Sequence, residues 1–204
     1  MALLARILAP DLFAAEIQDC GQEILLPGFE NALVEKSVPK RRREFALGRA
    51  CARAALEKLG HGQAVIGRNA ANGAPLWPEG VVGSITHTKG YAAALVGEAR
   101  HFSGIGVDAE HVGGVTENLW PRLFDAEEHA GLMALEDAAR PAFATLLFSA
   151  KEACYKASGG AAPLVFHDIH IAVEKDGFVA SRSGKNLQGR YAAEGSLMLT
   201  AVWF

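Results

Sequence analysis

The sequence lacks the features that mark several large protein classes. Its three cysteines, Cys20, Cys51 and Cys154, lie far apart and form no CxxC pair, so neither a zinc site nor a disulfide framework is expected. Cys51 and Cys154 are instead expected to be small buried apolar residues. The 20 basic and 23 acidic residues give a formal net charge of -3, whereas general nucleic-acid binders usually carry a positive surface. Any basic site must therefore be local, and no nucleic-acid partner is expected.

Long apolar runs and targeting signals are missing as well. The first ten residues, MALLARILAP, are apolar but lack both a positively charged leader and a small-residue cleavage site. No run approaches the roughly 20 apolar residues of a membrane span. With 204 residues, half of them hydrophobic, the chain is long enough for one large core or two small packed lobes. We therefore expect a globular, cytoplasmic protein without a membrane span.

Glycine, proline and apolar periodicity divide the chain into elements. Apolar residues recur at every fourth position between Arg42 and Leu59, and Gly60 follows as a stop signal, which predicts an amphipathic helix. Residues 71–80 (ANGAPLWPEG) are dense in glycine and proline and are expected to form a loop. After it, VVGSIT and YAAALVG predict the strands of a hairpin around HTKG. The other expected elements are strands at 104–110, 168–173 and 196–203, and helices at 125–136, with Asp125 as N-cap, and at 141–160.

The order of these elements repeats along the chain. A long helix followed by strands occurs once in each half, and the two helices are separated by about a hundred residues. This order is typical of a two-lobed duplication. Residue-level similarity between the halves is too weak to establish one, and no low-complexity segment or disordered linker separates them.

Two acidic residues lie close together in the segment GIGVDAE. Residues two apart in an extended strand point to the same side, so Asp108 and Glu110 project their carboxylates together while Ala109 faces the other way. Like charges raise each other's pKa, and Mg²⁺ resolves the conflict because it binds a few carboxylates and fills its shell with water and phosphate oxygens. Taken alone, such a pair is more often the solvated end of a strand.

The segment FSAKEACYKA carries three charged residues in an otherwise apolar helix. Glu152 and Lys156 are four residues apart and share a face, and the bland interpretation is an ordinary ion pair in water. Lys151 points about a quarter turn away. If the strand carboxylates face Glu152, the result is an oxygen-rich metal pocket with a lysine at its edge, which suits phosphate binding and proton supply.

Basic residues gather at the start of the first long helix. VPKRRREFALGR places a run of cations, including Arg41, at the helix N-terminus and Arg49 farther along. Cations there oppose the helix dipole, whereas arginine forks bind phosphate oxygens in pairs; a solvated basic face is the alternative. His87, beside Thr86 at a strand end, has the chemistry to donate to a phosphate, although a lone histidine is more often an ordinary surface or core residue.

Together these segments resemble a known family. The blocks RRREFALGRACARAAL, APLWP, GSITH, IGVDAE and FSAKEACYKA, in that order, are similar to those of 4′-phosphopantetheinyl transferases, specifically the Sfp-like type and its enterobactin synthase component D subgroup. The resemblance covers residues 26–158, and five ordered blocks make it specific. The rest of the chain matches only in the general expectation of closing strands.

The resemblance implies an α+β fold built from two similar α/β lobes related by pseudo-twofold symmetry. Residues 1–104 would form an N-terminal lobe that contacts the phosphates of coenzyme A. Residues 105–204 would form a C-terminal lobe with the metal and catalytic residues, and the active site would occupy the cleft between the lobes. The short fatty-acid-synthase type is about half this length and assembles as a trimer, so a chain with both lobes implies a monomer.

The family's functional residues map onto particular positions here. The implied metal ligands are Asp108, Glu110 and Glu152, with water completing the shell because Ala109 offers no ligand. The implied catalytic residues are Glu152 and Lys156, and the implied coenzyme A contacts are Arg41, Arg49, Thr86, His87, Asp108, Lys151 and Lys156. One departure stands out, since many members have a lysine before the proline of the mid-loop where this chain has Ala74. That contact must be absent or supplied by Lys89 or an arginine.

The implied reaction moves 4′-phosphopantetheine from coenzyme A to a serine of an acyl, peptidyl or aryl carrier protein and releases 3′,5′-ADP. Mg²⁺, with Mn²⁺ as the alternative ion, would neutralise charge on the pyrophosphate. Glu152 would receive the serine proton, directly or through water, while Lys156 would stabilise or protonate the leaving group. A siderophore, nonribosomal peptide or polyketide pathway is the expected setting. The rival interpretations are a non-catalytic coenzyme A-binding module and a magnesium-dependent phosphohydrolase.

Overall fold

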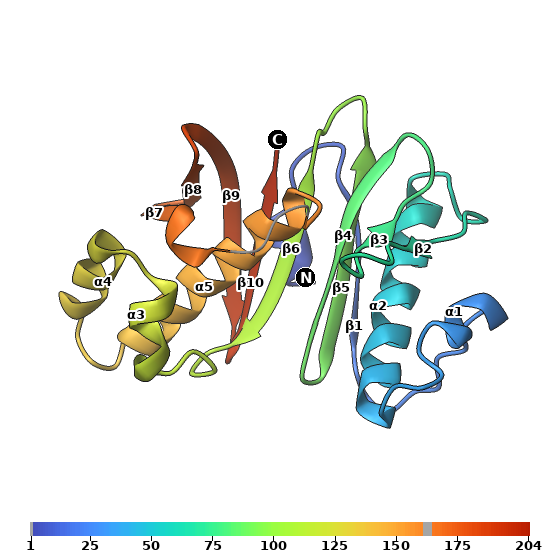
Figure 1. Cartoon of the computed structure of the whole chain (residues 1–204), viewed down its shortest axis with the longest axis horizontal. Coiled ribbons are helices and arrows are strands. Elements are labelled where there is room, and N and C mark those ends of the chain that lie inside the picture. Colours follow the sequence, from blue (N-terminus) through green and yellow to red (C-terminus); the bar gives the residue numbers. More distant parts are fainter. Residues whose placement is uncertain (1, 161–164) are drawn as a thin grey trace.

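Two antiparallel sheets, each covered by one long helix, form the structure (Figure 1). The computed structural model describes residues 2–160 and 165–204. The first sheet has the strand order β1-β5-β4 and the second has the order β6-β10-β9-β8-β7. The strands are β1 (Phe13–Gln18), β4 (Val81–Thr88), β5 (Tyr91–Glu98), β6 (Ile105–His111), β7 (His170–Glu174), β8 (Gly177–Arg182), β9 (Lys185–Glu194) and β10 (Leu197–Trp203). The expected mixed α+β class is confirmed.

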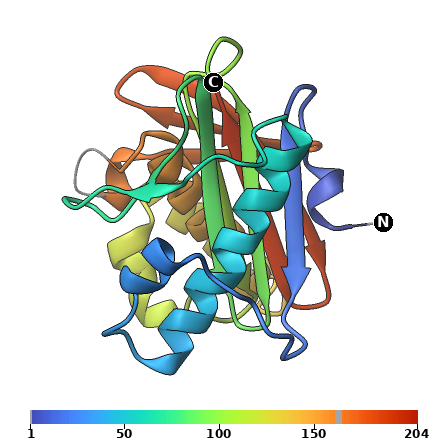
Figure 2. The same cartoon turned by 90° about the vertical axis from the view of Figure 1, so that its right-hand side faces the viewer.

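The N-terminal lobe, defined as the three-stranded sheet with its helix, follows the sequence pattern closely. β4 and β5 form the expected hairpin, and Gly90 in its turn has a φ of 77°, which favours glycine. The helix α2 (Pro39–Lys58) packs the apolar side expected of it, including Cys51 and Ala55, against the sheet (Figure 2). It begins three residues earlier than expected because a proline fits the first helical turn.

The C-terminal lobe, defined as the five-stranded sheet with its helices, contains both expected helices. Asp125 caps α4 (Ala126–Met133) through a capping box with Glu128. The longer α5 (Arg140–Ala157) has Pro141 in its first turn and ends before a glycine pair. β7 and β10 correspond to the expected closing strands, whereas β8 and β9 were not predicted because their many polar and glycine residues blur the strand alternation.

Several short elements lie between the main strands and helices. Within the expected loop at 71–80, Pro75–Leu76 form a short strand, β3, that pairs with β2 (Gly67–Arg68). A purely irregular loop was therefore a wrong prediction for these two residues. The other short elements are η1 (Leu4–Arg6), α1 (Gly28–Ala32), η2 (Glu117–Leu119), α3 (Trp120–Leu123) and η3 (Phe166–Asp168).

The apolar N-terminal segment contributes to the core between the lobes. Leu4 and Ile7 are buried in a cluster that contains Leu95 of β5 and Leu199 of β10. Arg6 donates to the carbonyl of Ala193 in β9 at 3.4 Å. The apolar residues of this segment therefore form part of the hydrophobic core. Across residues 2–160 and 165–204, no helix has the length and apolarity needed to cross a membrane.

Candidate active site

The two lobes meet along the edge strands β4 and β6. Each lies at the edge of its own sheet, and they are joined by side-chain contacts such as the one from the Val107 amide to the Ser84 hydroxyl at 3.1 Å. Helix α5 packs directly on β6 because Gly106 has no side chain; a Cβ there would lie 1.8 Å from the carbonyl oxygen of Ala153. This close approach brings the polar face of α5 to the acidic end of β6.

A lysine, a carboxylate and a hydroxyl converge at this seam from three elements. Lys156 of α5 donates to Asp108 Oδ1 at 2.6 Å and to the Val107 carbonyl at 3.2 Å. Thr86 of β4 lies 3.4 Å from the same ammonium and 3.3 Å from Asp108 Oδ1. Asp108 and Thr86 are buried, and about a quarter of the Lys156 side chain is exposed. Strand β6 and helix α5 therefore meet through Asp108 and Lys156, whereas the meeting of Asp108 and Glu110 with Glu152 around one ion stays a prediction.

Two more carboxylates act electrostatically on this cluster. Burial, together with the negative charges of Asp108 and Glu152, raises the pKa of Glu110 to about 7 against the opposing effect of Lys156. Burial also raises the pKa of Glu152, which Lys156 lowers and Asp108 raises. Three acidic groups and one ammonium therefore influence one another electrostatically, and this excess of negative charge favours either a proton or a cation.

The donor set fits a hard divalent cation. Asp108 Oδ2 is buried without a hydrogen-bond partner among residues 2–160 and 165–204, and a buried unpaired carboxylate oxygen is costly. Oxygen ligands from Asp108, Glu110 and Glu152 are those that Mg²⁺ prefers. Their ligand atoms are not all within 4.8 Å of one another, however. In the described residues, the group that meets this distance is Asp125, Glu128 and His170.

That compact group is accounted for by protein contacts. Asp125 Oδ1 accepts the backbone N–H groups of Glu127 and Glu128, and its Oδ2 lies 2.7 Å from Nδ1 of His170. Glu128 accepts from the Ile171 amide at 2.8 Å and from the Asp125 amide at 2.9 Å. Each of these carboxylate oxygens already has a donor, so the group is a helix cap and not a metal centre.

Lys151 is a correction to the sequence-based expectation. It was expected among the residues that bind coenzyme A, but its side chain has no exposed surface. Its ammonium donates to Glu128, at 2.5 Å, and to two backbone carbonyls inside the C-terminal lobe. Because residues 151 and 152 point about 100° apart on a helix, Glu152 faces the seam while Lys151 is buried.

A basic pocket lies beside the seam on the N-terminal lobe. Arg41 and His87 line it together with Arg68, in a cavity of about 130 Å³. Arg41 donates to Nε2 of His87 at 2.7 Å. Burial lowers the pKa of His87, Glu44 opposes this shift, and the charge of Arg41 adds to it, which favours a neutral imidazole beside Arg41, whose guanidinium also pairs with Glu44 at 3.6 Å.

Two residues predicted to contact phosphate, Arg49 and Thr86, hydrogen-bond to other groups of the protein. Arg49 lines the same pocket but is buried, and its guanidinium donates to the carbonyls of Ile66 at 2.6 Å and Gly67 at 2.9 Å. Thr86 cannot share a ligand with His87, because neighbouring residues of a strand point to opposite faces, and its hydroxyl is in the carboxylate cluster. Arg49 therefore supports the pocket wall, and Thr86 belongs to the cluster around Asp108.

Arg68 is a residue that the sequence reasoning did not single out. It lies in the two-residue strand β2 and lines the basic pocket with Arg41 and His87. Its guanidinium nitrogen would lie 3.2 Å from a Cβ at Gly73, so it reaches the mid-loop next to Ala74. The sequence did contain an indirect indication of Arg68. Because Ala74 replaces the lysine of many family members, the missing contact had to be absent or supplied by Lys89 or an arginine.

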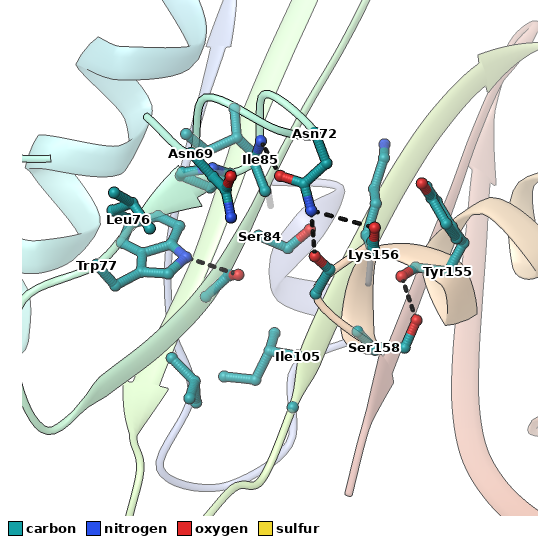
Figure 3. Close-up of a pocket in the computed structure, with 18 of the residues that line it drawn as sticks. Asn69, Asn72, Leu76, Trp77, Ser84, Ile85, Ile105, Tyr155, Lys156 and Ser158 are labelled. Carbon is teal, nitrogen blue, oxygen red and sulfur yellow. Dashed lines mark hydrogen bonds between the residues drawn. The ribbon is translucent and has the colours of Figure 1, made fainter. Parts of the chain in front are cut away.

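A larger cavity of about 550 Å³ lies next to this pocket and is lined by residues of both lobes. Figure 3 shows Leu76 and Trp77 on one side, Tyr155 and Ser158 on the other, and Lys156 at its edge. Asn72 bridges the two lobes by donating to the carbonyls of Gly159 at 3.0 Å and Gly160 at 3.1 Å. Gly73, Pro75 and Ile85 line both this cavity and the basic pocket, so the two spaces are adjacent.

Comparisons with known proteins match both lobes. Residues 29–97 match the 4′-phosphopantetheinyl transferase N-terminal domain, and residues 104–197 match the 4′-phosphopantetheinyl transferase superfamily. The chain is 38% identical over 185 residues to the 4′-phosphopantetheinyl transferase Npt of Nocardia iowensis, covering 89% of this chain and 82% of that protein. It is 38% identical over 193 residues to Svp of Streptomyces mobaraensis, covering 85% and 76%. Enterobactin synthase component D of Salmonella typhi is 38% identical over 120 residues, covering 58% and 48%.

Proposed function

Since this chain belongs to the 4′-phosphopantetheinyl transferase superfamily, we propose that it transfers the 4′-phosphopantetheine group of coenzyme A to a serine hydroxyl of an apo-carrier protein. The products are the holo-carrier and 3′,5′-ADP. The acceptor is an acyl, peptidyl or aryl carrier of a siderophore, nonribosomal peptide or polyketide pathway, and the enzyme acts as a cytoplasmic monomer. The observation that carries this proposal is the convergence of Lys156 and Asp108 beside a basic pocket.

The nucleotide end of coenzyme A would occupy the basic pocket and the adjacent cavity. Its 3′-phosphate takes the guanidinium groups of Arg41 and Arg68, with His87 as a third contact, because arginine forks match phosphate oxygens. The apolar cavity beside Trp77 receives the adenosine, and the pyrophosphate then lies toward Lys156 at the cavity edge. Arg49 supports this pocket from its buried position.

Asp108, Glu110 and Glu152 would hold the divalent ion, with Asp108 Oδ2 as the oxygen that lacks a protein partner. Mg²⁺ is the expected ion because it binds carboxylates together with phosphate oxygens. When bound, it supplies positive charge that stabilises the negative charge of a pyrophosphate in the transition state. Since the ligand atoms of the three carboxylates are not all within 4.8 Å of one another, their side chains would move closer together when the ion and coenzyme A bind.

The protein's own residues then handle the proton and the leaving group. The serine oxygen attacks the β-phosphorus of coenzyme A, and the bond from that phosphorus to the oxygen of 3′,5′-ADP breaks. Glu152 accepts the serine proton, a role suited to a carboxylate whose pKa is raised by burial. Lys156 stabilises the departing phosphate with its ammonium, and Thr86 and the Val107 carbonyl hold that ammonium in place.

Mass spectrometry tests the proposed function directly. The purified protein is incubated with coenzyme A, Mg²⁺ and a panel of apo-carriers, and the intact mass of each carrier is followed. We expect a carrier to gain one phosphopantetheine group as 3′,5′-ADP appears in equal amount. Cleavage of coenzyme A at the same rate without a carrier would instead identify a phosphohydrolase, and coenzyme A binding without product would identify a binding module.

For Arg68→Ala, which alters the basic pocket, we predict weaker use of coenzyme A. Loss of one charge-assisted phosphate contact, about 1.5–3 kcal/mol, should raise KM for coenzyme A about tenfold or more while leaving kcat within about twofold. Dephospho-coenzyme A lacks the 3′-phosphate, so the variant and the wild type should have similar KM values for it. Arg100→Ala, at an exposed arginine paired with Glu98, is the matched control. An equal loss with both substrates would contradict the assignment.

A further inference from the structure

Lys151, the residue before Glu152, has an environment that the proposed chemistry does not use. Its ammonium is buried and donates to three acceptors from three elements: the Leu123 carbonyl of α3 at 2.9 Å, Glu128 of α4 at 2.5 Å and the Phe166 carbonyl of η3 at 3.0 Å. A lysine ammonium has three donor hydrogens. Every one of them is therefore committed to a different part of the C-terminal lobe.

Glu128 extends these contacts to two further points. It is 4% exposed, and besides Lys151 it accepts from the backbone amides of Asp125 and Ile171. Ile171 belongs to β7, and Asp125 also lies within hydrogen-bond distance of His170 in the same strand. The Lys151–Glu128 pair thus ties α5 to α3, α4, η3 and β7 at one place.

Stability alone is a poor explanation for such a pair. Taking two charges out of water is costly, and replacing a buried ion pair with groups of similar volume is often neutral or stabilising. The pair instead orients α5, since the three hydrogen bonds of Lys151 restrict both the rotation of the helix about its axis and its position along that axis. Lys156, farther along the same helix, has its own bonds to Asp108 and the Val107 carbonyl of β6, so Lys151 bears most directly on its neighbour in the chain, Glu152.

We propose that Lys151 is a positioning residue, whose bonds to Leu123, Glu128 and Phe166 set the orientation of α5 so that Glu152 faces Asp108 and Glu110. This inference rests on the proposed function and assigns Lys151 no contact with substrate. A rotation of about 20° about the helix axis would move a glutamate carboxylate by more than an ångström, and misplacement of that size can cost about a hundredfold in rate. The residue acts through Glu152.

The test is Lys151→Met, which keeps the length of the side chain and removes its three bonds. We expect kcat for transfer to fall about 30- to 100-fold while KM for coenzyme A stays within about threefold. Independently of turnover, Mn²⁺ binding, followed by loss of the free-ion electron paramagnetic resonance signal, should weaken about tenfold because Glu152 is displaced. Lys175→Met, at an exposed lysine of the same lobe, is the matched control and should change neither value.

A second variant separates positioning from stability. Lys151→Met leaves Glu128 buried without its cation and is expected to lower Tm, or even to prevent folding. Lys151→Met/Glu128→Gln removes that charge and should recover Tm, yet it should keep the low kcat and the weak Mn²⁺ binding. Recovery of kcat along with Tm would reduce Lys151 to an ordinary stabilising residue and overturn the inference.

Other outcomes are equally decisive. A raised KM for coenzyme A with an unchanged kcat would make Lys151 a substrate contact, and unchanged Mn²⁺ affinity in a folded variant would show that Glu152 has not moved; either overturns the inference. If the wild-type protein transfers nothing to any carrier, the proposed function fails. The Mn²⁺ titration would then still decide whether Lys151 orients Glu152.

Discussion

Replacing Glu152 with glutamine is expected to lower kcat for carrier modification about a thousandfold without loss of fold. Glutamine has the same shape but accepts no proton, and general-base catalysis typically contributes about 10²–10⁴. It also removes one of the three charges that face one another at the seam. Because that relieves repulsion around a partly buried group, Tm should be unchanged or slightly higher. The measurements are the initial rate of holo-carrier formation and a thermal unfolding curve.

Glu174→Gln is the control for this variant, because Glu174 lies exposed in β7 and away from the seam. It should retain the wild-type rate. A Glu152→Gln protein that turns over at nearly the wild-type rate would remove Glu152 from both of its proposed roles and leave Glu110 as the carboxylate to examine. A large fall in Tm would instead mean that the lost activity reflects unfolding.

The second large effect is expected for Lys156→Met, with a fall in kcat of about 10²–10³. The ammonium lies 2.6 Å from Asp108 Oδ1 and at the edge of the cavity proposed for the nucleotide. Without it, neither the pyrophosphate nor the departing 3′,5′-ADP has a cation from the protein at this point. Unlike Glu152→Gln, this variant should also be less stable, since it leaves Asp108 as a buried, uncompensated carboxylate.

Lys156→Arg provides the matched comparison. It keeps the positive charge with a different shape, so it should recover stability fully and activity only in part. Full recovery of kcat by arginine would indicate that charge alone matters and that Lys156 donates no proton. Wild-type activity in Lys156→Met would contradict its assignment altogether.

Local sequence signals predicted the scaffold of the site well. The β4–β5 hairpin, the Asp125 cap of α4 and the extent of α5 follow from turn glycines, capping residues and apolar spacing. The meeting of Asp108 with Lys156 could be proposed because each residue lies on a face fixed by strand or helix periodicity. In each of these successful predictions, residues close together in the sequence determine the local backbone structure or the face on which a side chain lies.

The failures concern contacts that only tertiary packing decides. Lys151 and Lys156 belong to one helix, yet one is buried in an ion pair and the other faces the seam; the partner Glu128 lies 23 residues away in the chain. Arg41 and Arg49 are both arginines of α2, but the second donates to backbone carbonyls that the sequence does not place near it. Arg68 was missed because a two-residue strand leaves no periodic pattern.

The N-terminal segment has a consequence for how the chain folds. The hydrogen bond between Arg6 and Ala193 joins residues 187 positions apart, and Leu4 and Ile7 share a buried cluster with Leu199. Leu4 and Ile7 are therefore synthesised long before β10, against which they pack, so this cluster closes only after β10 has been made. Pairings this distant in sequence slow folding, and this apolar segment is exposed to chaperones or to aggregation until β10 is available to pack against it.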